Sequence, residues 1–102
     1  MAVNPEDIRE KIREGVIDPE IGLNIVDIGL IYDVEVEENI AEIDMTLTSP
    51  GCPLGPQIIR EVKVAVTSNF PELEAVNVNI VWQPFWSPEM MSDWAKDELG
   101  IF

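Results

Sequence analysis

Residues 31–47 read IYDVEVEENIAEIDMTL, and this stretch decides the fold. On both sides of Glu38-Asn39, apolar side chains alternate with acidic ones, which places the two kinds on opposite faces of an extended chain. Such alternation is typical of a strand with one buried and one solvated face, and a short polar pair between two such runs is typical of a tight turn. We therefore predict an antiparallel hairpin with one wet face.

Helices and further strands are expected on either side of this hairpin. Asn4 and Pro5 have the residue types of a helix N-cap and a first helical position, while Pro19 and Gly22 interrupt regular structure in the loop that follows. The other segments show alternation or helical spacing of their apolar residues. The predicted elements are a helix over 4–14, a loop over 18–23, a short strand over 25–28, the hairpin, a helix over 54–69, a strand over 76–82 and a helix over 87–99.

The predicted element order is therefore α-β-β-β-α-β-α. Because the longer strands each have one polar face, helices should cover only one side of the sheet. The segment from Ile40 to Trp82 is strand, helix, strand, which permits one parallel crossover. We predict a two-layer α+β fold, with one domain over residues 1–102, a small mixed and mostly antiparallel sheet, and helices on one face.

The charge of the chain argues against several classes of partner. Its 102 residues carry a net charge of -14 and only six Lys and Arg residues. Phosphate backbones and anionic lipids attract clusters of basic side chains, so neither nucleic acid nor a membrane surface is an expected partner. One cysteine cannot form an internal disulfide, no apolar run approaches the ~20 residues of a membrane span, and the first residues lack a signal-peptide pattern. We expect a cytoplasmic protein.

The chain contains no histidine. Histidine is the commonest general base and the commonest nitrogen ligand of metals. Its absence excludes Ser-His or Cys-His catalysis and His-bearing zinc sites from this chain alone. The alternative class is an enzyme that uses Cys52 as a nucleophile or redox thiol, and against it stands the lack of a second, resolving cysteine.

Cys52 is the first candidate functional residue. It lies in a proline- and glycine-rich segment between a predicted strand and a predicted helix. A helix start stabilises negative charge and favours the thiolate, which attacks electrophiles and binds soft metals. Residues 45–60 also contain no acid that would repel a thiolate. The alternative is an inert, buried cysteine. One thiolate cannot hold a cluster alone, so we expect transient metal contact, shared across a homodimer or with a partner's thiols.

Two other segments are candidates for the site. Asp18 and Glu20 could add oxygen ligands to a metal, or they could form an ordinary solvated turn. Trp82, Phe85 and Trp86 lie in a second segment without acids, where they could anchor a binding partner or close the small core. Both interpretations of each segment remain open at this point.

Four separated segments together resemble the family once catalogued as domain of unknown function fifty-nine, which includes SufT-like and PaaD-like proteins and the eukaryotic MMS-nineteen-interacting factor. The segments are Asp18-Pro19-Glu20, residues 26–32 (VDIGLIY), residues 46–54 (TLTSPGCPL) and residues 86–92 (WSPEMMS). The resemblance spans nearly the whole chain. It departs from the family pattern at residues 82–86: relatives often have Trp, an acid or small polar residue and Pro-Pro-Trp, whereas this chain has WQPFW.

The resemblance implies an iron-sulfur assembly domain fold and a non-catalytic accessory factor in iron-sulfur cluster assembly or delivery. Cys52 matches the family's reactive cysteine, with Thr48 and Ser49 in the same motif. Asp18 and Glu20 match its acidic loop. We expect Cys52 to contact iron, a cluster or a persulfide transiently, no cofactor to be needed for folding, and the partners to be the iron-sulfur assembly machinery and client apoproteins. The rival hypothesis is a protein-interaction adapter whose thiol is silent.

Overall fold

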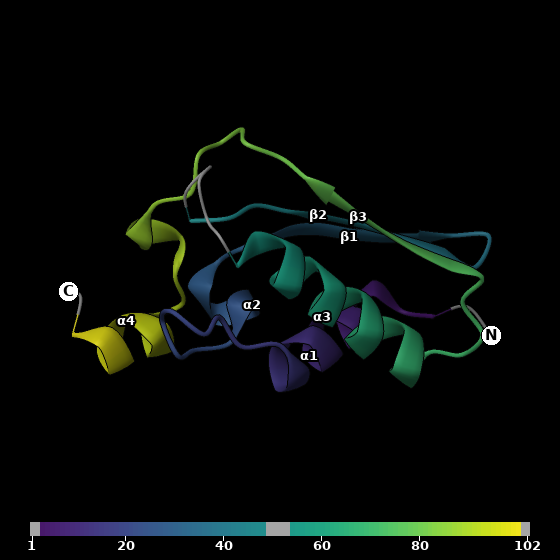
Figure 1. Ribbon diagram of the computed structural model, residues 1–102, viewed down its shortest axis with the longest axis horizontal. Coiled ribbons are helices and arrows are strands. Elements are labelled where there is room, and N and C mark those ends of the chain that lie inside the picture. The colour runs from purple at the N-terminus through teal and green to yellow at the C-terminus, as the bar shows by residue number, and fades with distance from the viewer. Residues whose placement is uncertain (1–2, 49–53, 101–102) are drawn as a thin grey trace.

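In the described part of the chain, helices cover one face of a three-stranded sheet (Figure 1). The computed structural model describes residues 3–48 and 54–100. The elements are α1 (Pro5–Gly15), α2 (Ile25–Ile28), β1 (Ile31–Glu37), β2 (Ile40–Met45), α3 (Gly55–Asn69), β3 (Ala75–Ile80), a 3₁₀ turn (Pro88–Met90) and α4 (Asp93–Leu99). The α+β class is confirmed, with the element order α-α-β-β-α-β-α.

The sheet has the strand order β1-β2-β3. β1 pairs antiparallel with β2, and β2 pairs parallel with β3 across the α3 crossover. Glu38 (φ 51°) and Asn39 (φ 66°) are both left-handed, as in the type I′ turns that match the twist of a two-residue hairpin. The predicted hairpin and the predicted parallel crossover are confirmed. The described sheet has one pairing of each kind, so "mostly antiparallel" is wrong, and β3 ends two residues earlier than predicted.

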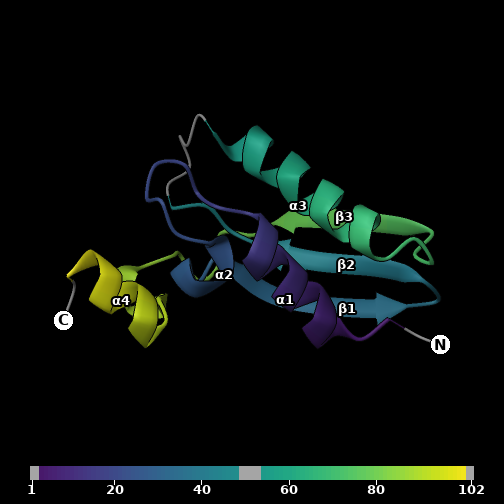
Figure 2. The ribbon, with the colours of Figure 1, turned by 90° about the horizontal axis from the view of Figure 1, so that it is seen from below.

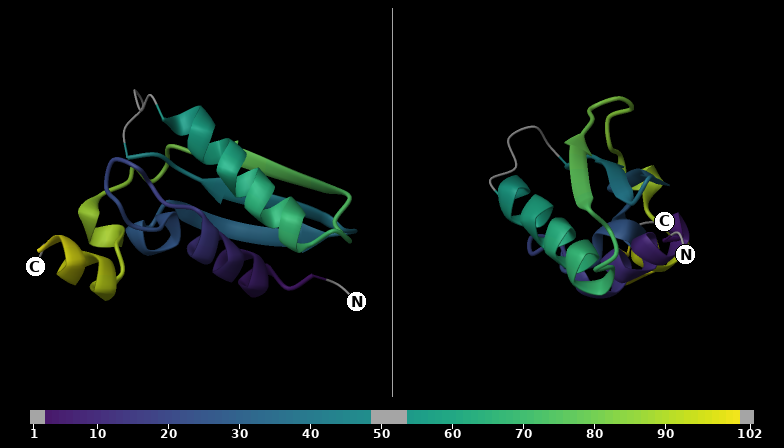
Figure 3. Two further views of the ribbon diagram at one scale, coloured as in Figure 1. Left: turned by 60° about the horizontal axis from the view of Figure 1, so that its bottom comes forward. Right: turned by 90° about the vertical axis from the view of Figure 1, so that its right-hand side faces the viewer.

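The hydrophobic core lies between the sheet and the two longer helices. Figures 2 and 3 show α1 and α3 crossing the same face of the sheet. The fully buried side chains here include Ile8 and Ile12 of α1, Ile43 and Met45 of β2, and Ile58, Val62 and Val66 of α3. Burying one such side chain stabilises a fold by about 1.5–3 kcal/mol. Because side chains alternate along a strand, the acids of the hairpin lie on the opposite face.

Residues 25–28 form the helix α2, so the prediction of a short strand there is wrong. The side chain of Asn24 caps α2, because its Oδ1 accepts a hydrogen bond from the backbone N–H of Asp27 at 2.9 Å. Gly29 ends the helix in the left-handed conformation (φ 93°) and donates its N–H to carbonyls of α2. Four residues carry too little periodicity to separate a helix from a strand. The usable signal was the cap residue, followed five positions later by glycine.

The C-terminal helix begins later than predicted. Residues 88–90 form a 3₁₀ turn, and Met91 is then extended (ψ 148°). The hydroxyl of Ser92 caps α4 by accepting a hydrogen bond from the N–H of Ala95 at 3.2 Å. The N–H of Ser92 also donates to the carbonyl of Asp27 at 2.7 Å. This tertiary hydrogen bond ties the chain to α2 at the point where the predicted continuous helix breaks.

The segment after β3 is anchored on α2. The indole Nε1 of Trp86 donates a hydrogen bond to the carbonyl of Ile28 at 2.9 Å. Gly29 lies so close to the 3₁₀ turn that a Cβ on it would be 2.5 Å from the carbonyl oxygen of Met90. The left-handed backbone and this close approach both favour glycine at position 29.

We predict that Gly29→Ala destabilises the protein more than Gly22→Ala does. Both glycines have a positive φ (93° and 85°), but a Cβ at Gly22 would meet no atom within 4 Å. The matched pair therefore shares the backbone strain, of about 1–2 kcal/mol, and differs in the clash with Met90. Overpacking adds about 1–3 kcal/mol to the cost of Gly29→Ala in urea unfolding. Equal costs for the two variants would contradict the close packing of α2 on the 3₁₀ turn.

Candidate functional site

Part of the predicted site lies outside the described residues. Cys52 and Ser49 both belong to that part, and the described residues that flank it are Thr48, which is partly exposed, and Leu54. α3 starts at Gly55, three positions after the cysteine in the sequence. Leu54 makes no side-chain cap hydrogen bond, and the first turn of α3 contains no acidic side chain. The positive end of the α3 dipole is therefore not neutralised by acids of its own first turn.

The loop that carries Asp18 is a compact turn. The Asp18 side chain is only 3% exposed. Its Oδ1 accepts hydrogen bonds from the backbone N–H groups of Glu20 at 2.8 Å and Ile21 at 3.3 Å. The backbone N–H of Asp18 donates to the carbonyl of Leu23 at 3.0 Å. This is the turn chemistry of aspartate, so the turn interpretation describes Asp18 correctly, although the side chain is buried rather than solvated.

The acidic loop and the start of α3 lie at the same end of the molecule. The loop connects α1 to α2, and Figures 2 and 3 show it near the first turn of α3. Glu20 is exposed on this loop. The described residues thus bring one predicted site segment, around Asp18 and Glu20, to the end of the fold where α3 begins.

The three predicted partner-binding aromatics have different surroundings. Trp86 is partly buried and donates its indole N–H to α2, and Trp82 is partly buried against the core. Phe85 is 62% exposed. The core-closing interpretation therefore describes the two tryptophans, while Phe85 has the exposure that a partner-binding residue needs.

A polar cluster around Asp27 was missed in the sequence. The Asp27 side chain is 10% exposed, and its Oδ2 accepts hydrogen bonds from Arg13 Nε at 2.9 Å and from Asn24 Nδ2 at 2.7 Å. Burial acts to raise the pKa of Asp27. Hydrogen bonds from Asn24, Arg13 and Ser92, with the positive charge of Arg13, outweigh burial and hold this pKa below its ordinary value. The cluster links α1, α2 and the start of α4, and the Asn-x-x-Asp spacing was its only local signal.

The described residues hold neither a metal-ligand cluster nor a membrane-spanning helix. Within residues 3–48 and 54–100, no three acidic or cysteine side chains converge as metal ligands. Among the helices of those ranges, none combines the length and apolar character needed to cross a membrane.

The fold and the sequence motifs define a class of small α+β domains whose β2–α3 connection carries a cysteine. A family model described as "Iron-sulfur cluster assembly protein" matches residues 5–80. The chain belongs to this family, and the resemblance predicted from its motifs is confirmed.

Two known relatives and one solved structure resemble the chain over most of their own length. The Fe-S protein maturation auxiliary factor SufT of Staphylococcus aureus is 54% identical over 87 residues, which are 84% of this chain and 98% of that protein. The Fe-S protein maturation auxiliary factor YitW of Bacillus subtilis is 51% identical, over 86% of each chain. A crystal structure of a domain of unknown function, DUF59, from Bacillus anthracis superposes with a TM-score of 0.90 at 46% identity, covering 96% of this chain and 92% of that one.

We predict that Asp27→Asn lowers stability at neutral pH and weakens the acid sensitivity of the fold. A carboxylate whose pKa is depressed on folding stabilises the native state above its unfolded pKa of about 3.9, and this contribution is lost as the pH falls through the lower, folded pKa. Loss of charged hydrogen bonds at this buried site should cost about 1.5–3 kcal/mol at pH 7.

Urea unfolding at several pH values measures this change in stability. The control is Asp97→Asn, which removes a carboxylate at an exposed position. The stability difference between Asp27→Asn and the native chain should shrink below about pH 4. A difference that stays constant down to pH 2 would contradict the role assigned to the charge of Asp27.

Proposed function

We propose that this protein is an auxiliary factor in the maturation of iron-sulfur proteins, acting in the cytoplasm without catalysing a reaction of its own. One observation carries the proposal: the 54% identity to SufT extends over 98% of that protein, whose name states this function. At such coverage the whole relative is compared, not a shared module within a longer chain. The iron-sulfur assembly machinery and client apoproteins are the partners that this function requires.

Cys52 is the proposed contact for cargo, which is iron, a cluster or a persulfide held transiently. Support comes from the start of α3, which has no acidic side chain in its first turn and no side-chain cap. A helix start of this kind favours an anion such as a thiolate nearby. The stretch from Met45 to Arg60 also contains no acid in a chain with 20 acidic residues. Because one thiolate cannot complete a cluster site, cargo is shared with a second subunit or with a partner.

Asp18 and Glu20 are proposed to belong to the same site, each with a different contribution. Asp18 holds the turn through its Oδ1, and the negative charge of its carboxylate is proposed to act at the site as well. Glu20 presents its side chain on the exposed surface of that turn. Their common location at the α3 end of the fold is the support for placing them near the cargo.

We predict that Cys52→Ala abolishes function in cells while leaving the fold intact. A strain that lacks this protein should lose activity in a cluster-dependent dehydratase, and the native gene should restore it. Cys52→Ala should restore little of that activity, because it removes the sulfur that contacts the cargo. Ser68→Ala, which changes an exposed side chain of α3, is the matched control and should restore activity fully.

The outcomes separate the parts of this proposal. Failure of the native gene to restore the dehydratase would overturn the maturation function. Full restoration by Cys52→Ala would leave that function standing and overturn the role of the sulfur, which favours the adapter hypothesis. A cluster-free enzyme measured in the same extracts shows whether the loss is specific to clusters.

We predict that Asp18→Asn and Asp18→Ala differ in stability but not in function. Asn keeps an Oδ1 acceptor for the turn and removes the charge, whereas Ala leaves the backbone N–H groups of Glu20 and Ile21 without their acceptor, at a cost of about 1 kcal/mol. If the carboxylate charge belongs to the site, both variants restore the dehydratase poorly, and Asp18→Asn does so with near-native thermal stability. Full restoration by Asp18→Asn would limit Asp18 to shaping the turn.

A further inference from the structure

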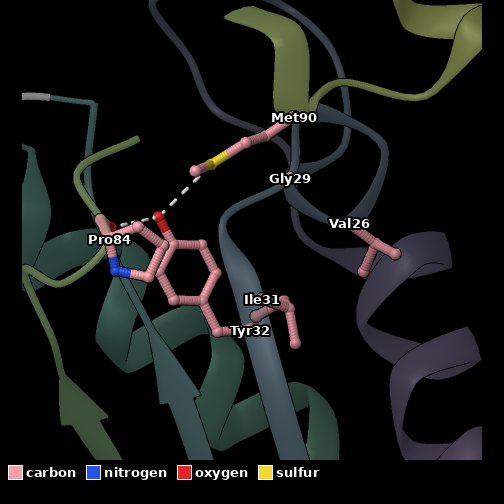
Figure 4. Close-up of a pocket in the computed structure, with 6 residues that line it drawn as sticks. All are labelled: Val26, Gly29, Ile31, Tyr32, Pro84 and Met90. Carbon is pink, nitrogen blue, oxygen red and sulfur yellow. Dashed lines mark hydrogen bonds between the residues drawn. The ribbon is translucent and has the colours of Figure 1, made fainter. Parts of the chain in front are cut away.

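An open apolar groove lies beside the start of β1. Its volume is about 570 Å³, and it is lined by Val26 and Gly29 from the α2 turn, Ile31 and Tyr32 from β1, and Pro84 and Met90 from the segment after β3. Figure 4 shows the Tyr32 ring between Pro84 and Ile31, with its hydroxyl directed toward Met90. Apolar walls with few polar atoms are the usual composition of a binding site for an apolar group.

Hydrogen bonds and close packing hold the walls of the groove together. The hydroxyl of Tyr32 donates to the carbonyl of Pro84 at 2.8 Å and lies 3.4 Å from the sulfur of Met90. On the opposite wall, Gly29 packs against the backbone of Met90. These contacts join three distant parts of the sequence, so the groove is formed before any partner arrives. A preformed groove lowers the entropy cost of binding.

The strand surface that continues from this groove is acidic. Asp33 follows Tyr32 along β1, and acids then occupy alternate positions of both hairpin strands. The acidic residues on this face are Asp33, Glu35 and Glu37 of β1 and Glu42 and Asp44 of β2. All six basic residues of the chain lie on helices: Arg9, Lys11 and Arg13 on α1, Arg60 and Lys63 on α3, and Lys96 on α4. The hairpin therefore has no cation of its own to balance these carboxylates.

The pairing of the acids costs stability. Asp33 lies directly opposite Asp44, and Glu35 lies opposite Glu42. Like charges that face each other across two strands are destabilising, whereas an oppositely charged pair would stabilise. Glu42 and Asp44 accept hydrogen bonds from the side-chain amides of Asn77 and Asn79 on β3, but these neutral groups leave the negative charges uncompensated. A positively charged partner laid along the strands would remove the repulsion.

A second, smaller cavity marks the far end of the same strands. Its volume is about 200 Å³, and it is lined by Glu37, Glu38, Ile40 and Glu42. β1 is 7 residues long, so the two cavities are about 20 Å apart at ~3.3 Å per residue. The hairpin strands therefore have the apolar groove at one end and the acidic cavity at the other.

We infer that the groove binds an apolar side chain of a basic, extended polypeptide segment, whose Lys or Arg residues lie along the acidic strand face. In an extended segment, alternate residues point the same way, which matches the spacing of the carboxylates.

A second copy of this chain fits poorly because each copy carries a net charge of -14. Arg9 belongs to α1, on the face of the sheet that the helices cover, and donates a hydrogen bond to the carbonyl of Ile31 at 3.3 Å. The acidic face, on the other side of the sheet, is therefore the one that the cations of the partner would contact. The inference does not depend on the role of Cys52.

Nuclear magnetic resonance of isotope-labelled methionine methyl groups tests this inference on the intact chain. The probe is a synthetic peptide with one phenylalanine followed by lysines that alternate with serines. Its control has alanine in place of phenylalanine. Met90 lines the groove, whereas Met45 is fully buried under the helices and serves as an internal reference. The phenylalanine peptide should shift the Met90 signal saturably and bind about fivefold or more tightly than the alanine peptide.

Two pairs of variants assign the binding to the two parts of the surface. Val26→Lys places a cation in the groove and should weaken binding about tenfold, whereas Val64→Lys changes an exposed residue of α3 and should not. Glu35→Gln should weaken binding about threefold while keeping or raising stability, because it removes a like-charge pair. Glu61→Gln, on α3, is the matched control.

Several results would overturn the inference. These are equal affinities for the two peptides, an unchanged Met90 signal at saturating peptide, or native affinity in Val26→Lys. A Met90 signal that shifts with protein concentration in the absence of peptide would show self-association, and a second copy would then be the occupant. Equal binding of spermidine and the phenylalanine peptide would show that the acids attract any cation and that the groove plays no part.

Discussion

The fold depends on burying one face of a small sheet under α1 and α3. The strands can serve this core because their apolar residues recur at every second position over residues 34–36 and 41–45, and a register irregularity between Ile31 and Asp33 leaves Ile31 buried as well. The same alternation places the acids of both strands on the opposite face, where no basic residue of the strands compensates their charge. A single constraint on the core thus produces both the stability of the molecule and its acidic surface. It also fixes the crossover from β2 to α3, the connection that carries the cysteine of the chain.

Besides the core, the fold depends on the contacts that attach residues 86–92 to α2 and Gly29. Trp86, Gly29 and Ser92 each make one of them, through an indole hydrogen bond, a close backbone approach and a main-chain hydrogen bond. Asp27 adds a charged link to α1. Because these contacts bring Tyr32 and Met90 together, they also build the apolar groove. Residues that hold the fold together therefore shape a surface that is open to a partner.

Sequence reasoning succeeded where a pattern was long or chemically specific. Alternation over residues 32–37 and a polar turn were enough for the hairpin, and helical spacing over fifteen residues was enough for α3. It failed at α2, where four residues carry no period, and at Pro88, which resembles a helix start although Ser92 makes the cap. Both wrong predictions concern α2 and the segment around residues 88–92, which contact each other in the fold. Such contacts join residues about 60 positions apart and leave no local pattern.

In the described part of the candidate site, the sequence predicted the turn at Asp18 but not the different surroundings of the three aromatic residues. The turn at Asp18 follows from the residue types of the loop, and the family follows from four spaced motifs. The sequence did not indicate which of the aromatic residues are buried and which is exposed. The burial of Trp86, for example, depends on its hydrogen bond to the carbonyl of Ile28, a residue 58 positions away. The cluster at Asp27 was missed for the same reason: Arg13 lies on another helix.

The sulfur of Cys52 is the proposed contact for iron, a cluster or a persulfide, and anaerobic reconstitution with iron and sulfide measures whether it binds iron. The native protein and Cys52→Ala are each mixed with iron and sulfide in the absence of oxygen, desalted, and compared by visible absorption. We expect sulfur-to-iron charge-transfer bands in the native protein that are lost in Cys52→Ala. Identical, featureless spectra from the two proteins, with and without an iron-sulfur client apoprotein present, would contradict this expectation.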